Sequence, residues 1–228
     1  MSDPAIVVES VSKNFRLYHE RNRYIKAAIL RGRRARYEEF WALDDVSFAV
    51  EHGSTLGIIG FGRIGQAMAQ RAHFGFGMKI IVQNRSAVPA EVLARYNAVQ
   101  VPTIEDLLPQ CDFVSLHCPG GVANRHLINS RRLDLMRPGA FLINTARGEV
   151  VDEHALAQAL WFGTIGGAGL DVFEREPKIP RELLDSDNLV LLPHLGSATR
   201  ETREAMGFRV LENLSDFFEG RQPRDRVA

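Results

Sequence analysis

The sequence predicts an α/β protein with a doubly wound parallel sheet, and three observations lead to this prediction. From Gly53 to the C-terminus, short apolar segments alternate with amphipathic ones. The apolar segments are continuous rather than alternating, as in strands buried on both faces. A glycine-rich turn at residues 60–65 follows the first of them and opens a helical segment. Strands separated by helices in this way form a parallel sheet covered on both sides.

The elements after Gly53 follow one another in a regular order. A capped turn is expected at Thr103, because Asp106 lies three residues on, near the spacing of a capping box. The expected strands cover residues 55–59, 79–83, 112–117, 140–144, 167–172 and 188–192, and the expected helices cover 64–71, 89–96, 130–136, 152–162 and 199–219.

The first part of the chain has a different pattern, so we divide it into an N-terminal segment, 1–52, and a regular α/β domain, 53–228. Strand-like runs at 6–8 and 46–50 flank a basic middle that is expected to be helical. Residues 21–36 hold seven basic side chains and no acidic one. Such a run is most often a solvated or disordered loop, and the alternative is a contact with a polyanion or a membrane surface. We expect this segment to be β-rich and partly disordered.

Composition excludes several classes of function. The chain has 228 residues, and its 28 basic and 28 acidic side chains give a formal net charge of zero. A dedicated nucleic-acid binder would carry a basic excess, so no nucleic-acid partner is expected. Two cysteines, Cys111 and Cys118, exclude a disulfide scaffold and suit a reducing cytoplasm. No signal peptide or membrane span is predicted, and no metal site is singled out.

The glycine turn is a G-x-G-x-x-G motif formed by Gly60, Gly62 and Gly65. Between a strand and a helix, this motif is typical of a Rossmann-type dinucleotide site. The first glycine permits the tight turn, the second lets the backbone approach a pyrophosphate, and the third lets helix and strand pack closely. The helix N-terminus then offers N–H groups to the phosphates. The alternative is a glycine-rich turn that binds nothing.

The end of the second strand bears on which dinucleotide is bound. An NAD site places Asp or Glu about 20 residues after the glycines, where it bonds the ribose 2′-hydroxyl. This sequence has Asn84, Arg85 and Ser86 there and no acid. Arg85 can pair with a 2′-phosphate, and Asn84 and Ser86 can donate hydrogen bonds to it. NADP(H) is therefore preferred and NAD(H) remains possible, unless Arg85 is merely a surface arginine.

Three further side chains lie at predicted strand ends: Arg147, Glu176 and His194. The carboxyl ends of parallel strands meet at one edge of the sheet, so these side chains are expected to converge on one crevice. The set suits reduction of a 2-oxo acid. Arg147 would bind the substrate carboxylate and polarise the carbonyl, His194 would donate a proton, and Glu176 would hold the imidazole and keep it protonated near neutral pH. Taken singly, each could be an ordinary surface or core residue.

The region from about Gly53 onward resembles the D-isomer-specific 2-hydroxyacid dehydrogenases, and within them the glyoxylate/hydroxypyruvate reductases. The matching stretches are 56–65, 84–86, 116–119, 144–148, 167–173 and 193–197. The resemblance implies a homodimer formed through this domain and a catalytic set of Arg147, Glu176 and His194. It also implies that Asp171 lies near the nicotinamide carboxamide. The full set of expected cofactor-binding residues is Gly60, Phe61, Gly62, Arg63, Ile64, Gly65, Asn84, Arg85, Ser86, His117, Cys118, Pro119, Asn124, Thr145, Ala146, Asp171 and Gly196.

The resemblance also implies an N-terminal substrate-binding domain, on the order of 100 residues, and we expect that region to be replaced here. Residues 5–59 instead resemble the start of a polysaccharide-export ABC transporter ATPase, in which an aromatic such as Phe15 or Tyr18 would stack on adenine. An ATPase needs a Lys and a hydroxyl after the second glycine of its phosphate loop, where this chain has Gln66 and Ala67. ATP hydrolysis is therefore not expected.

Three hypotheses follow for the function. The first is a reductase that uses NADPH on glyoxylate or hydroxypyruvate. The second is a nucleotide-binding module whose turnover is impaired by the missing substrate domain. The third is a fused reading frame in which the N-terminal segment is a non-functional ATPase fragment.

Overall fold

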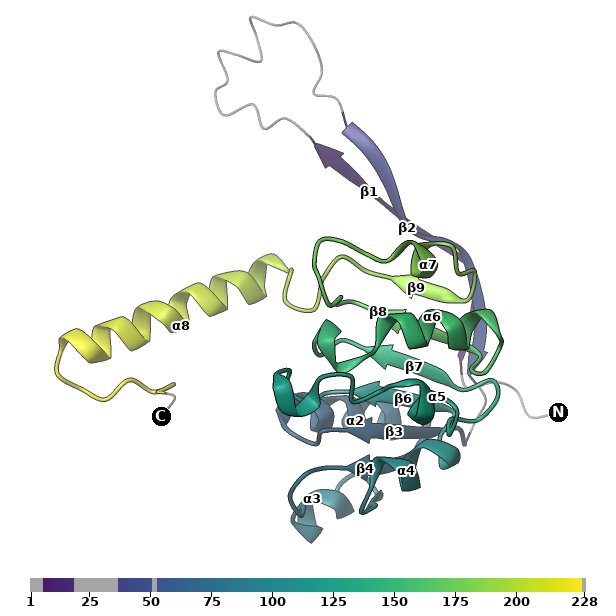
Figure 1. The fold of residues 1–228 in the computed structure, drawn as a ribbon. Helices are drawn as coiled ribbons and strands as arrows, with labels where there is room; N and C mark the ends of the chain where they lie inside the picture. The colour runs from purple at the N-terminus through teal and green to yellow at the C-terminus, as the bar shows by residue number, and fades with distance from the viewer. Residues whose placement is uncertain (1–5, 19–36, 51–52, 227–228) are drawn as a thin grey trace, which may run out of the picture.

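A seven-stranded parallel sheet forms the body of the protein (Figure 1). The structure, a computed structural model, describes residues 6–18, 37–50 and 53–226. The strand order is β5-β4-β3-β6-β7-β8-β9, and every neighbouring pair is parallel. The strands are β3 (Thr55–Ile59), β4 (Lys79–Gln83), β5 (Ala98–Gln100), β6 (Phe113–Leu116), β7 (Phe141–Asn144), β8 (Gly167–Leu170) and β9 (Leu189–Leu191). The order reverses at β3, so the carboxyl ends of β3 and β6 flank the crevice in which such sheets bind ligands.

Helices pack on both faces of this sheet, which confirms the doubly wound α/β prediction. One face is covered by α2 (Arg63–Phe76) and α3 (Ala90–Ala94), which pack with Leu56, Ile58, Ile80 and Val82. The other is covered by α4 (Ile104–Leu107), α5 (Ser130–Leu133) and α6 (Glu153–Trp161), which pack with Ile59, Val114 and Leu142. Ile58 and Ile59 are both fully buried and belong to opposite clusters, because neighbouring strand residues point to opposite faces.

Most predicted elements lie within a few residues of their expected bounds. The predicted cap at Thr103 is present as a capping box with Asp106. Helix α2 runs further than predicted, to Phe76, and is capped by Gly77, whose left-handed φ of 62° lets its N–H bond back to the last turn. Helices α3 and α5 are shorter than predicted. Strand β5 and helix α7 (Arg181–Leu184) were not predicted, because both are too short to show a period.

In the N-terminal segment, β1 (Ile6–Tyr18) and β2 (Tyr37–Val50) form a two-stranded antiparallel hairpin. The register pairs Ile6 with Val50 and Tyr18 with Tyr37, with irregularities between Val8 and Asn14. Both strands extend the predicted runs at 6–8 and 46–50. The predicted helix in the basic run at 21–36 lies outside the described residues.

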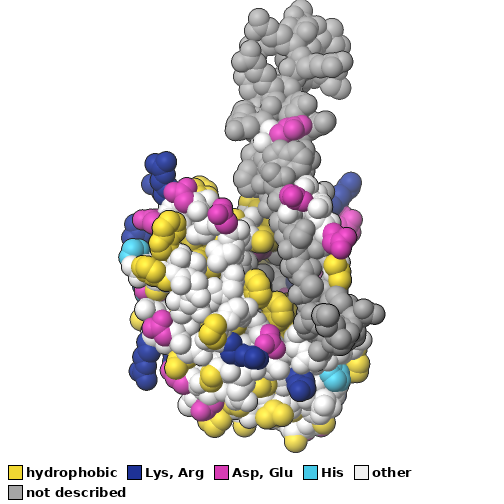
Figure 2. All heavy atoms as spheres, turned by 90° about the vertical axis from the view of Figure 1, so that its right-hand side faces the viewer, with side chains coloured by type: hydrophobic (Ala, Val, Ile, Leu, Met, Phe, Trp, Pro, Cys, Tyr) yellow, Lys and Arg dark blue, Asp and Glu magenta, His cyan; other side chains and the backbone are white. Residues whose placement is uncertain are grey.

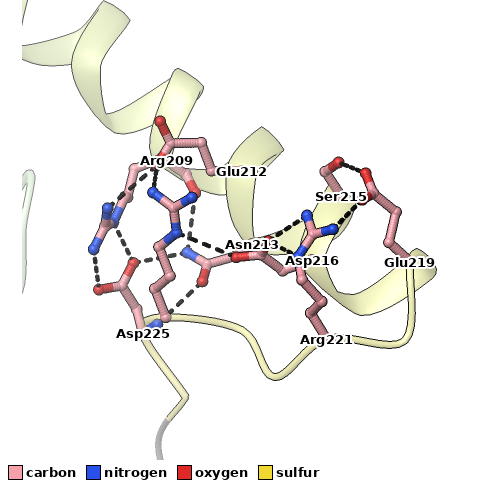
Figure 3. A network of polar contacts seen from close by, with 9 residues as sticks. Arg209, Glu212, Asn213, Ser215, Asp216, Glu219, Arg221 and Asp225 are labelled. Atoms are coloured by element: carbon pink, nitrogen blue, oxygen red, sulfur yellow. Dashed lines mark hydrogen bonds and ion pairs between the residues drawn. The ribbon is translucent and has the colours of Figure 1, made fainter.

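The last helix, α8 (Arg200–Phe218), stands away from the sheet, and the chain after it folds back along it (Figure 1). Ion pairs fasten this tail to one side of the helix: Asp225 bonds Arg209 Nε at 2.5 Å, and Arg221 bonds Asp216 at 2.7 Å (Figure 3). On another side, large apolar side chains are exposed. They follow at helical spacing and include Met206, Val210, Leu214 and Phe217.

The face opposite the crevice is mixed in character. Figure 2 views it from the side of the amino ends of the strands, where charged side chains of both signs are interspersed with hydrophobic ones. Within the described residues, no helix is both long and apolar enough to cross a membrane.

Candidate active site

A cleft of about 420 Å³ lies at the carboxyl ends of β3, β4 and β6. It is lined by nine of the residues predicted to bind a dinucleotide: Gly60, Gly62, Asn84, Arg85, Ser86, His117, Cys118, Pro119 and Asn124. Ile59, Gln83, Ile104 and Leu127 also line it. These four residues carry no sequence signal for a nucleotide site, because Ile104 and Leu127 lie outside the motifs and Ile59 and Gln83 are ordinary strand residues.

The structure explains why glycine is present at each of the three motif positions. A Cβ on Gly60 would lie 2.7 Å from the backbone of Cys118, and one on Gly65 would lie 2.2 Å from the carbonyl oxygen of Gly60. Both glycines are therefore required by close backbone packing, and Gly60 also has a left-handed φ of 92°. A Cβ on Gly62 would meet nothing within 4 Å, so this glycine faces open space at the start of α2. The turn thus leaves room for a phosphate at the helix N-terminus, where no acidic side chain competes.

The loop after β4 is held in place by hydrogen bonds of Asn84, within the loop, and of Gln100, at the end of β5. Asn84 Oδ1 accepts the N–H of Phe61 at 3.0 Å, and Asn84 Nδ2 donates to the Ser86 carbonyl at 3.0 Å. Gln100 accepts the Val88 N–H at 2.8 Å and donates to the Ser86 carbonyl at 3.1 Å. The side chain of Asn84 is therefore occupied in holding the loop, while Arg85 is exposed. Among the described residues that line the cleft, Arg85 alone is charged at neutral pH.

The opposite side of the cleft is formed by residues 117–127, which we call the cleft wall. Burial lowers the pKa of His117, whose Nε2 lies 2.9 Å from Ser115 Oγ. Burial also raises the pKa of the Cys118 thiol. Both side chains are therefore uncharged at neutral pH. Asn124 Nδ2 donates to the Pro119 carbonyl at 2.8 Å and closes the turn within the wall.

The other predicted cofactor residues lie outside the lining of this cleft. The Phe61 side chain is buried in the core against Tyr96, so only its backbone faces the motif. Arg63 and Ile64 are exposed in the first turn of α2, and Gly65 is buried behind it. Thr145 and Ala146 lie after β7, where the Asn144 side chain accepts the Ala146 N–H at 3.0 Å.

Asp171 is buried and fastens the loop that carries His194. Its two carboxylate oxygens accept the N–H groups of Leu195 at 2.6 Å and Gly196 at 2.8 Å. His194 itself has a left-handed φ of 55°. The two hydrogen bonds to Asp171 therefore stabilise the loop in which His194 adopts this unusual backbone conformation.

The structure brings Arg147, Glu176 and His194 together at the carboxyl ends of β7, β8 and β9, as the sequence predicts. The Glu176 Oε2 atom accepts a hydrogen bond from His194 Nδ1 at 2.8 Å, and Oε1 accepts the N–H of Phe173 at 3.0 Å. Burial alone would raise the pKa of Glu176. The hydrogen bonds from His194 and Phe173 and the positive charges of His194 and Arg147 outweigh it, so the pKa lies below its ordinary value. Glu176 is therefore ionised at neutral pH and holds Nδ1, which leaves Nε2 as the nitrogen that can give up a proton.

Close packing explains how Arg147 reaches this pair. A Cβ on Gly148 would lie 1.9 Å from the carbonyl carbon of Phe173, so only glycine lets the two loops touch. Asn144 is fully buried and donates to the Arg147 carbonyl at 2.9 Å, which fixes the turn. The three side chains nonetheless face solvent: the side chains of Glu176 and His194 are 36% and 47% exposed, and Arg147 is exposed.

Fold and site together define a dinucleotide-binding domain of the dehydrogenase class. A model of the "D-isomer specific 2-hydroxyacid dehydrogenase, NAD binding domain" matches residues 22–196, a region that begins ahead of Gly53. The chain belongs to this family.

Similar proteins agree with this assignment. The glyoxylate reductase of Thermococcus litoralis is 51% identical over 178 residues, which cover 77% of this chain and 52% of that one. A glyoxylate/hydroxypyruvate reductase B from Pectobacterium carotovorum is 49% identical over 72% of this chain and 51% of that one. The NADPH-dependent glyoxylate/hydroxypyruvate reductase of Sinorhizobium meliloti, solved with NADP and malonate, has a TM-score of 0.70 at 39% identity and covers 76% of this chain and 52% of that chain. The chain spans about half the length of the curated relatives it matches.

Proposed function

We propose that this protein is an NAD(P)-dependent oxidoreductase that reduces a small 2-oxo acid, glyoxylate or hydroxypyruvate, to the 2-hydroxy acid. The observation that carries the proposal is the 2.8 Å bond between Glu176 and His194 beside Arg147, at the strand ends next to the nucleotide cleft. The names of the similar enzymes support the same substrates.

The residues divide the chemistry between them. When bound in the cleft, the reduced nicotinamide supplies the hydride. The Arg147 guanidinium would bind the substrate carboxylate and draw electron density from the carbonyl. His194 would pass the proton on Nε2 to the carbonyl oxygen, with Glu176 holding the ring and stabilising its positive charge.

We further propose that NADPH is preferred over NADH. Arg85 is the one charged side chain among the described residues that line the cleft, and no acid follows β4 in the sequence 84–86 to repel a 2′-phosphate. We also propose a homodimer formed through this domain and a cytoplasmic location.

The alternative is a nucleotide-binding module with impaired turnover, and one observation favours it. Glu176 and His194 are substantially exposed, whereas proton transfer and carboxylate binding are strengthened by a site closed to water. The division at residue 52 and the resemblance of residues 5–59 to an ATPase fragment stay predictions.

One assay separates these functions. The protein is first titrated with NADPH or NADH while the fluorescence of the reduced nicotinamide reports binding, and glyoxylate or hydroxypyruvate is then added while its absorbance reports oxidation. Nucleotide oxidation that is lost in the His194→Asn variant supports the reductase. Nucleotide binding without oxidation supports the module, and binding of neither nucleotide contradicts both.

A further inference from the structure

Outside the catalytic set, three segments meet at His126. The imidazole lies between two carboxylates: Nε2 is hydrogen-bonded to Glu174 Oε1, and Nδ1 is 3.7 Å from Asp152 Oδ2. Arg125 adds a second contact, 3.4 Å from Nη2 to the same Glu174 oxygen. His126 has a left-handed φ of 49°, a conformation that a residue other than glycine rarely adopts.

Two of these segments, those of His126 and Glu174, form the two sides of the proposed site. His126 belongs to the cleft wall, between Asn124 and Leu127, which both line the nucleotide cleft. Glu174 belongs to residues 173–176, which we call the catalytic turn, because this turn ends at Glu176 and its Phe173 N–H donates to that carboxylate. A hydrogen bond from His126 to Glu174 therefore joins the cleft wall to the turn that carries Glu176, the residue bonded to His194.

The environment of Glu174 strengthens its hydrogen bond with His126. The Glu174 side chain is only 16% exposed, and its backbone N–H donates to buried Glu153 at 2.7 Å. A charge-assisted hydrogen bond to a largely buried carboxylate is stronger than one in water. The backbone of the cleft wall is itself anchored, since the His126 N–H donates to the Glu149 carbonyl at 2.8 Å. The side chains of His126 and Arg125 extend that anchor to the catalytic turn.

We propose that His126 is a positioning residue that couples the nucleotide cleft to the catalytic turn through Glu174. The functional meaning of this coupling rests on the proposed function, whereas the hydrogen bond itself is a feature of the fold. A nucleotide that orders the cleft wall would then also order the turn that presents Glu176 to His194. The link is a hydrogen bond, so it depends on a donor at the position of Nε2 and not on the bulk of the ring.

Hydrogen exchange of the full chain, read for the peptide over residues 172–178, tests this coupling directly. His126→Asn keeps a residue that tolerates a left-handed backbone but is too short to reach Glu174. His126→Gln places an amide N–H near the position of Nε2. His154→Asn is the matched control, because His154 is exposed on α6 and contacts Gln158 at 3.2 Å.

The expected result has two parts. Without nucleotide, His126→Asn speeds exchange in this peptide about tenfold, His126→Gln restores the wild-type rate, and His154→Asn changes nothing. With NADPH, exchange in the same peptide slows in the wild type and does not slow in His126→Asn. Glu174→Ala removes the bond from its other end and should reproduce the His126→Asn result.

Either of two outcomes would overturn the coupling: wild-type exchange in both His126→Asn and Glu174→Ala, or no restoration by His126→Gln. If the wild type binds no nucleotide, the proposed function fails, and the nucleotide-free comparison still decides whether His126 holds the catalytic turn.

Discussion

The nucleotide cleft and the catalytic set lie at the same edge of one sheet, but the chain forms them in different ways. The cleft is shaped by backbone: Gly60 and Gly65 have no room for a Cβ, and the backbone N–H groups of Phe61 and Val88 donate to Asn84 and Gln100 beside the loop after β4. In the catalytic set, the backbones are equally well fixed, but the side chains of Glu176 and His194 face solvent. The difference indicates that the sheet and its turns are sufficient to form the nucleotide cleft. They do not shield the catalytic side chains from solvent.

The largest expected effect separates chemistry from binding. His194→Asn should lower kcat about 1,000-fold, because it removes the group that protonates the carbonyl. The Kd for NADPH should stay within about twofold, since His194 lies outside the lining of the cleft. Steady-state kinetics and a fluorescence titration check the two values, with His154→Asn as the control. A higher Kd for NADPH with an unchanged kcat would show that His194 acts in nucleotide binding, so that the cleft and the catalytic set are not functionally separate.

The next effect tests the backbone packing of the cleft. Gly65→Ala places a Cβ 2.2 Å from the Gly60 oxygen, and should lower the free energy of unfolding by about 3 kcal/mol. Gly75→Ala is the matched control in the same helix, where a Cβ meets nothing within 4 Å, and should stabilise the protein by up to about 1 kcal/mol. Urea denaturation measures both, and equal effects would refute the packing argument.

The third effect sharpens the assignment of the nucleotide. Arg85→Asp should raise the Kd for NADPH about 30-fold and change that for NADH by less than about threefold, because only NADPH carries a 2′-phosphate. Arg95→Asp is the control, since Arg95 is exposed at the end of α3, away from the cleft. Equal losses for both nucleotides would place Arg85 on another part of the ligand.

The smallest effect concerns Glu153, which lies behind the catalytic turn. Burial raises its pKa above the ordinary 4.5, and the hydrogen bond from the Glu174 N–H partly opposes this. The carboxyl group therefore stays protonated to a higher pH in the folded protein than in the unfolded protein. Its contribution to stability therefore falls as pH rises from about 4.5 through the raised pKa. Glu153→Gln keeps an oxygen for the Glu174 N–H, and should stabilise the protein by about 1 kcal/mol at pH 7 and less at pH 4.5.

The control for that prediction is Glu91→Gln, an exposed acid of α3. It should leave the pH dependence of urea denaturation unchanged. A Glu153→Gln variant that is less stable at pH 7 than the wild type would show that the charge itself is needed there.

Much of the sheet and the catalytic set could be predicted from the sequence. Continuous apolar segments locate β3, β4 and β7, and the topology of parallel strands then brings Arg147, Glu176 and His194 to one edge. The contact between His126 and Glu174 could not be predicted, because it joins residues 48 positions apart on loops without a period. The sequence predicts helix α8 as well, but an amphipathic pattern does not say what the helix packs against.

The most direct test of the account is a calorimetric titration of the full chain with NADPH, without substrate. We predict saturable binding at one site per chain, lost in Gly65→Ala and weakened in Arg85→Asp but not in His194→Asn. Absence of binding by a wild-type chain that is folded would contradict the claim that the cleft is complete within this sheet.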